Sequence, residues 1–280
     1  MATIPKDILN FVGGQECLSV AEQWLEKLSP VDGRVLCRVT RSGAADIKAA
    51  VDAAAAAQPA WAERTVVARG DLVREIAMKI RQRREEIAEL VSLETGKSRK
   101  LALGETDAAM EMGMFIAGEG RRYYGRTTTA GMLHRSVMAV RQPIGIAGLI
   151  ISSNTPMPNI AWKVFPAIFC GNAAILKPSE DTPLSAWIFG RICSEVGLPA
   201  GVLNIVHGYG KEAGMPLVES PRVKLISFTG SCETGRLVNK VASERLAKVC
   251  MELGGKNAMV VCDDADLANA LNWALQSAFS

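Results

Sequence analysis

Residues 171–180 read GNAAILKPSE, and this stretch decides the fold. The apolar run Ala173–Lys177 predicts a buried strand, which the turn at Pro178–Glu180 ends. Helical patterns lie on both sides of it, over Trp162–Phe169 and over Pro183–Glu195. A continuous apolar strand between two helices is typical of a parallel sheet whose faces are both covered by helices.

The same alternation continues outward along the chain. Further strands are predicted at Ile146–Ser152, Leu203–His207, Leu225–Thr229 and Met259–Cys262, and further helices at Lys211–Glu219 and Gly235–Ala247. Ligands of such sheets bind beyond the carboxyl ends of the strands. Four residues of interest fall at or close to these ends, namely Asn154, Lys177, Gly208 and Gly230. The sequence therefore predicts an α/β fold with a binding site along this edge.

The region ahead of the sheet is mainly helical by pattern. A turn at residues 29–34 (SPVDGR) precedes a short strand, Val35–Val39. The alanine-rich segment Ala44–Ala57 predicts a helix, with Pro59 just beyond its end. Isoleucines at helical spacing predict one long amphipathic helix over Thr65–Glu94, which Gly96 ends. Another helix is expected over Leu101–Ala117.

Two extended segments interrupt the helices and the sheet. They are Tyr123–Thr129 and Ser136–Arg141, joined around Gly131. Neither segment has the continuous apolar run of a buried strand. We therefore expect a protruding β-hairpin.

The composition excludes several classes of protein. In 280 residues, 49% are hydrophobic and 22% charged, which indicates a globular protein rather than a disordered one. The net charge of +3 is too small to favour nucleic acid or a membrane surface as a partner. Seven cysteines without a C-x-x-C pair, and only two histidines, give little support for a metal site. Residues 1–10 lack the apolar core of a signal peptide, so we expect a cytoplasmic protein with reduced thiols.

Two motifs suit a nucleotide. Lys177 and Glu180 place a cation and a carboxylate at a strand end, where they suit ribose hydroxyls, although a surface ion pair is the alternative. The spacing of Gly208, Gly210 and Gly214 is one residue longer than the dinucleotide-binding fingerprint, and these residues taken alone favour an ordinary glycine loop.

A third motif, FTGS at residues 228–231, ends a strand ahead of a helix. Its small residues Thr229, Gly230 and Ser231 leave a helix N-terminus open to a phosphate or a nicotinamide ribose. A simple Thr/Ser helix cap is the alternative, and both interpretations are compatible.

Two residues suit acyl chemistry. Asn154 follows a strand end, where its amide can donate a hydrogen bond to an oxyanion, although a lone loop asparagine is usually a turn former. Glu252 precedes Gly254 and Gly255 in ELGGK (252–256), as a general base on a tight turn would, or as an ordinary helix or turn end would.

In this order, the motifs GNAAILKPSE, FTGS and ELGGK resemble the NAD(P)-dependent aldehyde dehydrogenase superfamily, and the resemblance covers essentially the whole chain. It implies a Rossmann-type parallel sheet with helices on both faces and a protruding hairpin. Residues 1–119 and 143–251 would form the dinucleotide-binding domain, and residues 252–280 would begin a catalytic domain. The hairpin 120–142 would pair with a neighbouring subunit in a homo-oligomer.

The resemblance also implies roles for individual residues. The cofactor would be NAD rather than NADP, because Glu180 beside the adenosine ribose repels a 2′-phosphate. Asn154 would line the oxyanion hole, and Glu252 would activate the water that hydrolyses a thioester. The implied cofactor-binding residues are Lys177, Ser179, Glu180, Gly210, Thr229, Gly230, Ser231 and Gly254, and the implied substrate-pocket residues are Thr155 and Trp162. Trp162 as plain core is the alternative.

The chain departs from the family pattern at residues 153–156. The family often has Trp-Asn-aromatic-Pro, whereas this sequence reads SNTP, so a relative's aldehyde preference does not transfer. The family's nucleophilic cysteine would follow within about half a dozen residues after Ser280. Cys250 is the nearest substitute, and on a strand it would share a face with Glu252, although cysteines are more often buried as small hydrophobes.

The implied activity is oxidation of an aldehyde to a carboxylate through a cysteine thioester. The presence of Glu252 favours carboxylate over acyl-CoA as the product. We expect this chain alone not to complete a turnover. A non-catalytic dinucleotide-binding module and one half of a split enzyme are the alternatives.

Overall fold

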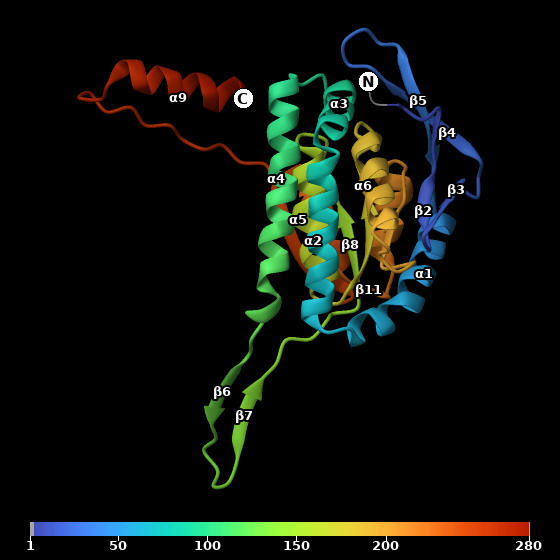
Figure 1. Ribbon diagram of the computed structural model, residues 1–280, viewed down its shortest axis with the longest axis vertical. Coiled ribbons are helices and arrows are strands. Elements are labelled where there is room, and N and C mark those ends of the chain that lie inside the picture. The colour runs from blue at the N-terminus through green and yellow to red at the C-terminus, as the bar shows by residue number, and fades with distance from the viewer. Residues whose placement is uncertain (1–2, 280) are drawn as a thin grey trace.

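The computed structural model describes residues 3–279, and its centre is a seven-stranded sheet with the order β12-β11-β8-β9-β10-β2-β3 (Figure 1). Five strands run parallel, as predicted, and they are β8 (Ile146–Ile150), β9 (Ala173–Lys177), β10 (Leu203–Ile205), β11 (Val223–Gly230) and β12 (Lys248–Leu253). The strands β2 (Asn10–Val12) and β3 (Gln15–Cys17) extend the sheet antiparallel beyond β10. A separate small sheet has the order β1-β5-β4, with β1 (Asp7–Ile8), β4 (Gln23–Leu28) and β5 (Val35–Arg41).

Helices cover both faces of the large sheet. One face packs against α1 (Ala44–Glu63), α7 (Met215–Glu219) and α8 (Cys232–Glu244). The other packs against α2 (Val66–Gln82), α3 (Arg84–Thr95), α4 (Arg99–Gly118), α5 (Pro156–Phe169) and α6 (Pro183–Glu195). In β8, Ile146 and Ile150 belong to the first core and Ala147 and Leu149 to the second, because successive side chains of a strand point to opposite faces.

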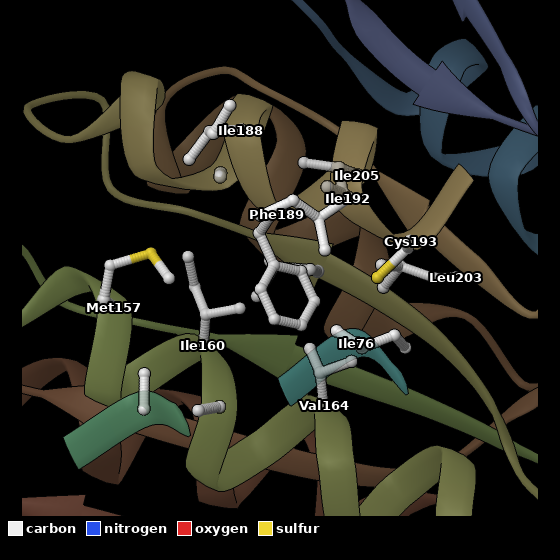
Figure 2. Packing of buried hydrophobic residues seen from close by; sticks show 14 of the residues in the cluster. Ile76, Met157, Ile160, Val164, Ile188, Phe189, Ile192, Cys193, Leu203 and Ile205 are labelled. Atoms are coloured by element: carbon white, nitrogen blue, oxygen red, sulfur yellow. The ribbon is translucent and has the colours of Figure 1, made fainter. Parts of the chain in front are cut away.

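The second core fixes α5 firmly. Met157, Ile160 and Val164 recur at helical spacing on α5 and face Phe189 of α6 (Figure 2). Met157, Ile160, Val164 and Phe189 are all fully buried. The opposite side of α5 is therefore held in a defined position.

The hairpin is confirmed, and it protrudes from one end of the body (Figure 1). Its strands are β6 (Arg126–Thr129) and β7 (Ser136–Ala139), paired antiparallel and exposed along their whole length. A short 3-10 turn, Glu119–Arg121, links it to α4. The helix α9 (Leu267–Phe279) lies away from the body near its other end (Figure 1). No helix within residues 3–279 is long and apolar enough to cross a membrane.

The prediction of one helix over Thr65–Glu94 is wrong. The helix breaks at Arg83, whose φ of −101° and ψ of 19° end α2 and begin α3. The Arg83 guanidinium bonds Glu86 and, across the fold, Glu195 of α6. These tertiary contacts hold the break, which the apolar spacing does not show. Gly96 ends α3 as predicted, in the left-handed region at φ 76°.

The expected end of the first helix is also wrong, because Pro59 lies inside α1. The helix continues to Glu63 and buries Trp61. The Trp61 indole Nε1 donates a hydrogen bond of 2.8 Å to the carbonyl oxygen of Ile168. Burial of this large side chain offsets the hydrogen bond lost at proline.

The fifth parallel strand was misplaced. Met259–Cys262 forms no strand, and β12 occupies the sheet edge beside β11. The chain leaves β11 through α8 and returns next to it, which completes a βαβ crossover before residue 259 is reached. The predicted helix Lys211–Glu219 is a π-helical turn, Gly210–Gly214, followed by α7, and the helix predicted at Gly235–Ala247 begins and ends three residues earlier, as α8.

Candidate functional site

Two cavities lie near the carboxyl ends of β8 and β11. We call them the apolar cavity, of about 510 Å³, and the polar cavity, of about 300 Å³. Strand β11 contributes to both, because Phe228 lines the apolar cavity whereas its neighbours Ser227 and Thr229 line the polar one. One strand therefore joins two sites of different chemistry.

Aliphatic and aromatic side chains form much of the wall of the apolar cavity. Its lining is Ile150, Glu180, Tyr209, Gly210, Lys211, Glu212, Gly214, Met215, Phe228, Thr234, Leu237 and Val238. Two residues predicted from sequence, Glu180 and Gly210, are among them. An apolar slot with a carboxylate at its rim can hold a flat base and bond hydroxyl groups.

Lys177 is the cation beside this cavity. It is only 3% exposed at the end of β9, and its Nζ donates to Oε2 of Glu180 at 3.1 Å. The ion pair named as the alternative is therefore present, although its lysine is buried and only its glutamate reaches the surface. Burial, with the nearby Lys177 charge, lowers the pKa of His207 to about 3, so this neighbouring imidazole is neutral. Ser179 shapes the intervening turn, where its Oγ accepts from the amide of Asp181 at 3.3 Å.

The glycine loop has a fixed shape. Gly208 has φ of +145°, and a Cβ there would lie 2.8 Å from the carbonyl oxygen of Ser42, so only glycine fits. Arg41 bonds both carboxylate oxygens of Glu212, and its guanidinium lies 5.0 Å from the ring centroid of Tyr209. The rim of the apolar cavity is thereby held by β5.

The residues of the FTGS motif have different structural roles. Ser231 caps α8, since its Oγ accepts from the amide of Thr234 at 3.2 Å, which confirms the capping interpretation. Gly230 ends β11, and Thr229 lines the polar cavity. Gly254 lies in the exposed loop after β12, where its carbonyl oxygen contacts the Cys232 thiol at 3.4 Å. The motif thus spans the wall between the two cavities.

The polar cavity brings the predicted acyl-chemistry residues together. Its lining is Asn154, Thr155, Asn159, Trp162, Lys163, Ser227, Thr229, Cys250, Glu252 and Leu253. In the sheet register Thr229 pairs with Glu252, and Ser227 with Cys250, so these side chains come from adjacent strands. Trp162 is 52% exposed, so the alternative that it is plain core is wrong. Glu252 is in a regular strand, not at a helix or turn end.

Asn154 lies in the exposed loop between β8 and α5. Its Oδ1 accepts from Ser152 Oγ at 2.5 Å and from Asn159 Nδ2 at 3.1 Å. The Nδ2 group of Asn154 is then available as a donor at the polar cavity, as an oxyanion contact requires.

Lys163 is a functional candidate that sequence reasoning did not assign. It is buried on α5, and its Nζ donates to Ser227 Oγ at 2.6 Å. Burial lowers the pKa of Lys163, while Cys250 and Glu252 act in the opposite direction. Its available signal was spacing, because Asn159 and Lys163 lie four residues apart and hence on one side of a helix that begins just after Asn154.

A metal-dependent site finds no support in the described residues. No group of three or more His, Cys, Asp or Glu side chains within residues 3–279 is arranged to hold a metal ion. All seven cysteines are free thiols in this part of the chain, and Cys232, Cys250 and Cys262 are exposed. The wall of the polar cavity carries amide, hydroxyl, carboxylate, amine and thiol groups.

Comparison with known proteins agrees with this arrangement. The profile of the aldehyde dehydrogenase family matches residues 18–280. A 2-aminomuconic semialdehyde dehydrogenase of Mus musculus is 36% identical over 272 residues, covering 97% of this chain and 55% of that enzyme. The chain spans little more than half the length of the curated relatives it matches.

Two solved structures share the fold. An NADP dependent enzyme of E. coli is 34% identical with a TM-score of 0.95, and the match covers 97% of this chain and 56% of that one. A betaine aldehyde dehydrogenase from Staphylococcus aureus, in complex with NAD+, is 31% identical with a TM-score of 0.94, over 96% of this chain and 54% of that one. The chain belongs to the aldehyde dehydrogenase family.

Proposed function

We propose that the enzyme containing this chain oxidises an aldehyde to a carboxylate with NAD, through a cysteine thioester. One observation carries the proposal: Asn154 and Glu252 line the same polar cavity, and β11 contributes side chains both to it and to a cavity suited to a nucleotide. In this proposal residues 1–119 and 143–251 form the dinucleotide-binding domain, and residues 252–280 belong to the catalytic domain.

The residues of the apolar cavity fit a dinucleotide. Its apolar walls suit an adenine ring, and Lys177 and Glu180 suit the hydroxyls of the attached ribose. Ser179, Gly210, Gly230, Ser231 and Gly254 lie along the remaining path toward the polar cavity in this proposal. When the dinucleotide is bound, its nicotinamide group would supply the acceptor for the hydride that aldehyde oxidation releases at the polar cavity. Glu180 supports NAD over NADP, because its carboxylate repels a 2′-phosphate.

Asn154 supports the first chemical step. Attack of a thiolate on the aldehyde carbonyl places negative charge on its oxygen, and the free Nδ2 of Asn154 can donate to that oxygen. Thr155 and Trp162 line the same cavity and would contact the aldehyde side chain. The thiolate itself would come from a further cysteine of the catalytic domain, near the polar cavity.

Glu252 supports the second step. A carboxylate at the cavity wall can take a proton from water as the water attacks the thioester carbonyl, which releases the carboxylic acid and regenerates the thiol. Lys163, bonded to Ser227, lies near that carboxylate, and Glu252 partly opposes the lowering of the Lys163 pKa by burial. A base in this position supports hydrolysis over transfer to coenzyme A.

Exposed apolar side chains support proposed contacts beyond this chain. Several lie on β12 and the segment after it, namely Val249, Leu253, Met259, Val260, Val261, Leu267, Leu271, Trp273 and Leu275. In the proposal the rest of the catalytic domain covers them. The exposed hairpin residues Val137, Met138 and Val140 would contact a second subunit.

Two measurements test the proposal. Titration of this chain with NAD and with NADP should give saturable binding, with NAD the tighter ligand. The full-length enzyme should form NADH in an aldehyde-dependent reaction, with the carboxylate as product. Binding without turnover by the full-length enzyme would favour a non-catalytic dinucleotide-binding module, and turnover only after addition of a separate cysteine-bearing polypeptide would favour a split enzyme.

A further inference from the structure

The orientation of the Asn154 amide depends on another asparagine. An amide side chain has two ends of similar shape, and only its NH2 end donates. If the Asn154 amide turned over, its oxygen would face the polar cavity and repel an oxyanion. Something in the structure must therefore set which end faces the cavity.

Asn159 identifies the correct end. Its Nδ2 lies 3.1 Å from the side-chain oxygen of Asn154 and 3.4 Å from the main-chain carbonyl oxygen of Ser152. A main-chain carbonyl only accepts hydrogen bonds, so the Asn159 atom that faces it must be the NH2 group. The Asn154 atom that faces the same NH2 group must then be oxygen. This removes the ambiguity of both amides together.

Asn159 is itself held rigidly. It is 6% exposed on α5, a helix whose Met157, Ile160 and Val164 are fully buried against α6 (Figure 2). Ser152 adds a second donor, because its Oγ lies 2.5 Å from the same Asn154 oxygen. Two donors thus occupy one end of the amide, and its other end carries the free NH2 group.

A third donor holds the main chain of the same residue. Lys97, in the loop between α3 and α4, bonds both the carbonyl oxygen of Asn154 and the carboxylate of Glu105. Its side chain is one-quarter exposed, and that of Glu105 is largely buried. The loop that carries Asn154 is thereby tied to α4 as well as to α5.

We infer that Asn159 is a positioning residue for aldehyde oxidation, which fixes the Asn154 amide with its NH2 end toward the reacting carbonyl, assisted by Ser152 and Lys97. The inference rests on the proposed function, in which Asn154 contacts the oxyanion. Asn159 also lines the polar cavity, and its proposed role is to act on the reaction through Asn154.

The test is a double-mutant cycle in the full-length enzyme. Asn159→Leu keeps the approximate shape of the side chain and removes the donor, so kcat should fall about tenfold, with KM and the Kd of NAD within about twofold. In an Asn154→Ala background the same substitution should change kcat less than about twofold, because the residue it positions is absent. An equal loss in both backgrounds, or no loss in the native one, would overturn the inference.

Two further variants protect the test from effects on folding. Asn159→Asp is closely isosteric and places an acceptor where the donor was, so it should turn the Asn154 amide and lower kcat at least as much as Asn159→Leu. Ser152→Ala should give a smaller loss of the same kind. Native kcat in Asn159→Asp would overturn the inference.

The matched control is Asn204→Leu. Asn204 is also a buried asparagine with two hydrogen bonds, to Gly13 and Gly201, but it lines neither cavity. The Asn204→Leu variant should lower the melting temperature about as much as Asn159→Leu does, and it should leave kcat unchanged. An unchanged kcat in Asn154→Ala alone would instead reject the role of Asn154 in the proposed function, an outcome distinct from failure of the cycle.

Discussion

The apolar and polar cavities share strand β11 but differ in what surrounds them. The apolar cavity is bounded by β8, β11, α7 and α8 with charged groups at its rim, whereas the polar cavity has amide, ammonium, hydroxyl, thiol and carboxylate groups in its wall. A strand that points successive side chains to opposite faces makes this division possible with Phe228 between Ser227 and Thr229. The difference teaches that binding and chemistry can be separated by single residues of one strand, so variants should affect one without the other.

Glu252→Gln should give the largest effect on kcat, and it should impair the chemistry of the polar cavity without changing NAD binding. Removing the base that activates water should lower the kcat of the full-length enzyme about 10²- to 10⁴-fold. The Kd of NAD should remain within about twofold, because Glu252 does not line the apolar cavity. Steady-state kinetics with product analysis measures the loss, and the exposed Glu244→Gln serves as the control. If Glu252→Gln has the same kcat as the native enzyme, Glu252 is not the general base.

Lys177→Met should weaken NAD binding at the apolar cavity without affecting the polar cavity. The variant removes a buried cation and leaves Glu180 without its partner, so the Kd of NAD should rise about 10- to 100-fold. Calorimetric titration of this chain measures the affinity without any need for turnover. Lys224→Met, at an exposed lysine of β11, should bind NAD normally. Equal affinities of the two variants would contradict the assignment of Lys177.

Glu180→Ser should sharpen the comparison within the apolar cavity. Without the carboxylate the 2′-phosphate of NADP is no longer repelled, so the ratio of the two Kd values should shift toward NADP about tenfold. The adjacent exposed residue offers a matched control, Asp181→Asn, which should leave the ratio unchanged. A shift of the same size in both variants would indicate a general charge effect rather than a contact.

A substitution at Glu94 should change the free energy of unfolding without affecting either cavity. Its buried carboxyl accepts from the amides of Leu184 and Ser185 at the start of α6, and burial raises its pKa to about 8 despite these bonds. The folded state then holds a proton that the unfolded state has lost, so stability is fully present below pH 4.5 and falls as the pH rises toward 8.

The slope in this window should approach about 1.4 kcal/mol per pH unit. Glu94→Gln should remove that contribution while NAD affinity is retained. Urea denaturation between pH 5 and 8 measures the free energy of unfolding of the native protein and of Glu94→Gln. Parallel pH curves for the two would contradict the assignment to Glu94.

Cys250→Ser should have the smallest effect. The thiol lines the polar cavity beside Glu252, yet the proposed mechanism assigns it no bond to substrate. The kcat of the full-length enzyme should change less than about twofold. A loss comparable to that of Glu252→Gln would make Cys250 the nucleophile and would replace the proposal of a cysteine outside these residues.

The sequence by itself determined the parallel sheet, its covering helices, the hairpin and the family. Continuous apolar runs and glycine or proline turns are local signals, so they survive without knowledge of tertiary contacts. Lys177, Glu180, Asn154 and Glu252 could be named because each lies at a strand end or in a motif that the family shares. Their individual roles stay predictions.

The tertiary structure alone decided which residues meet. The break at Arg83 and the continuation past Pro59 depend on Glu195 and on the carbonyl of Ile168, both far away in the chain. The fifth strand is β12, which pairs with the free edge of β11, whereas the apolar run at residues 259–262 forms no strand. The donors around Asn154 come from two loops and from α5, and no local pattern reports where these segments converge.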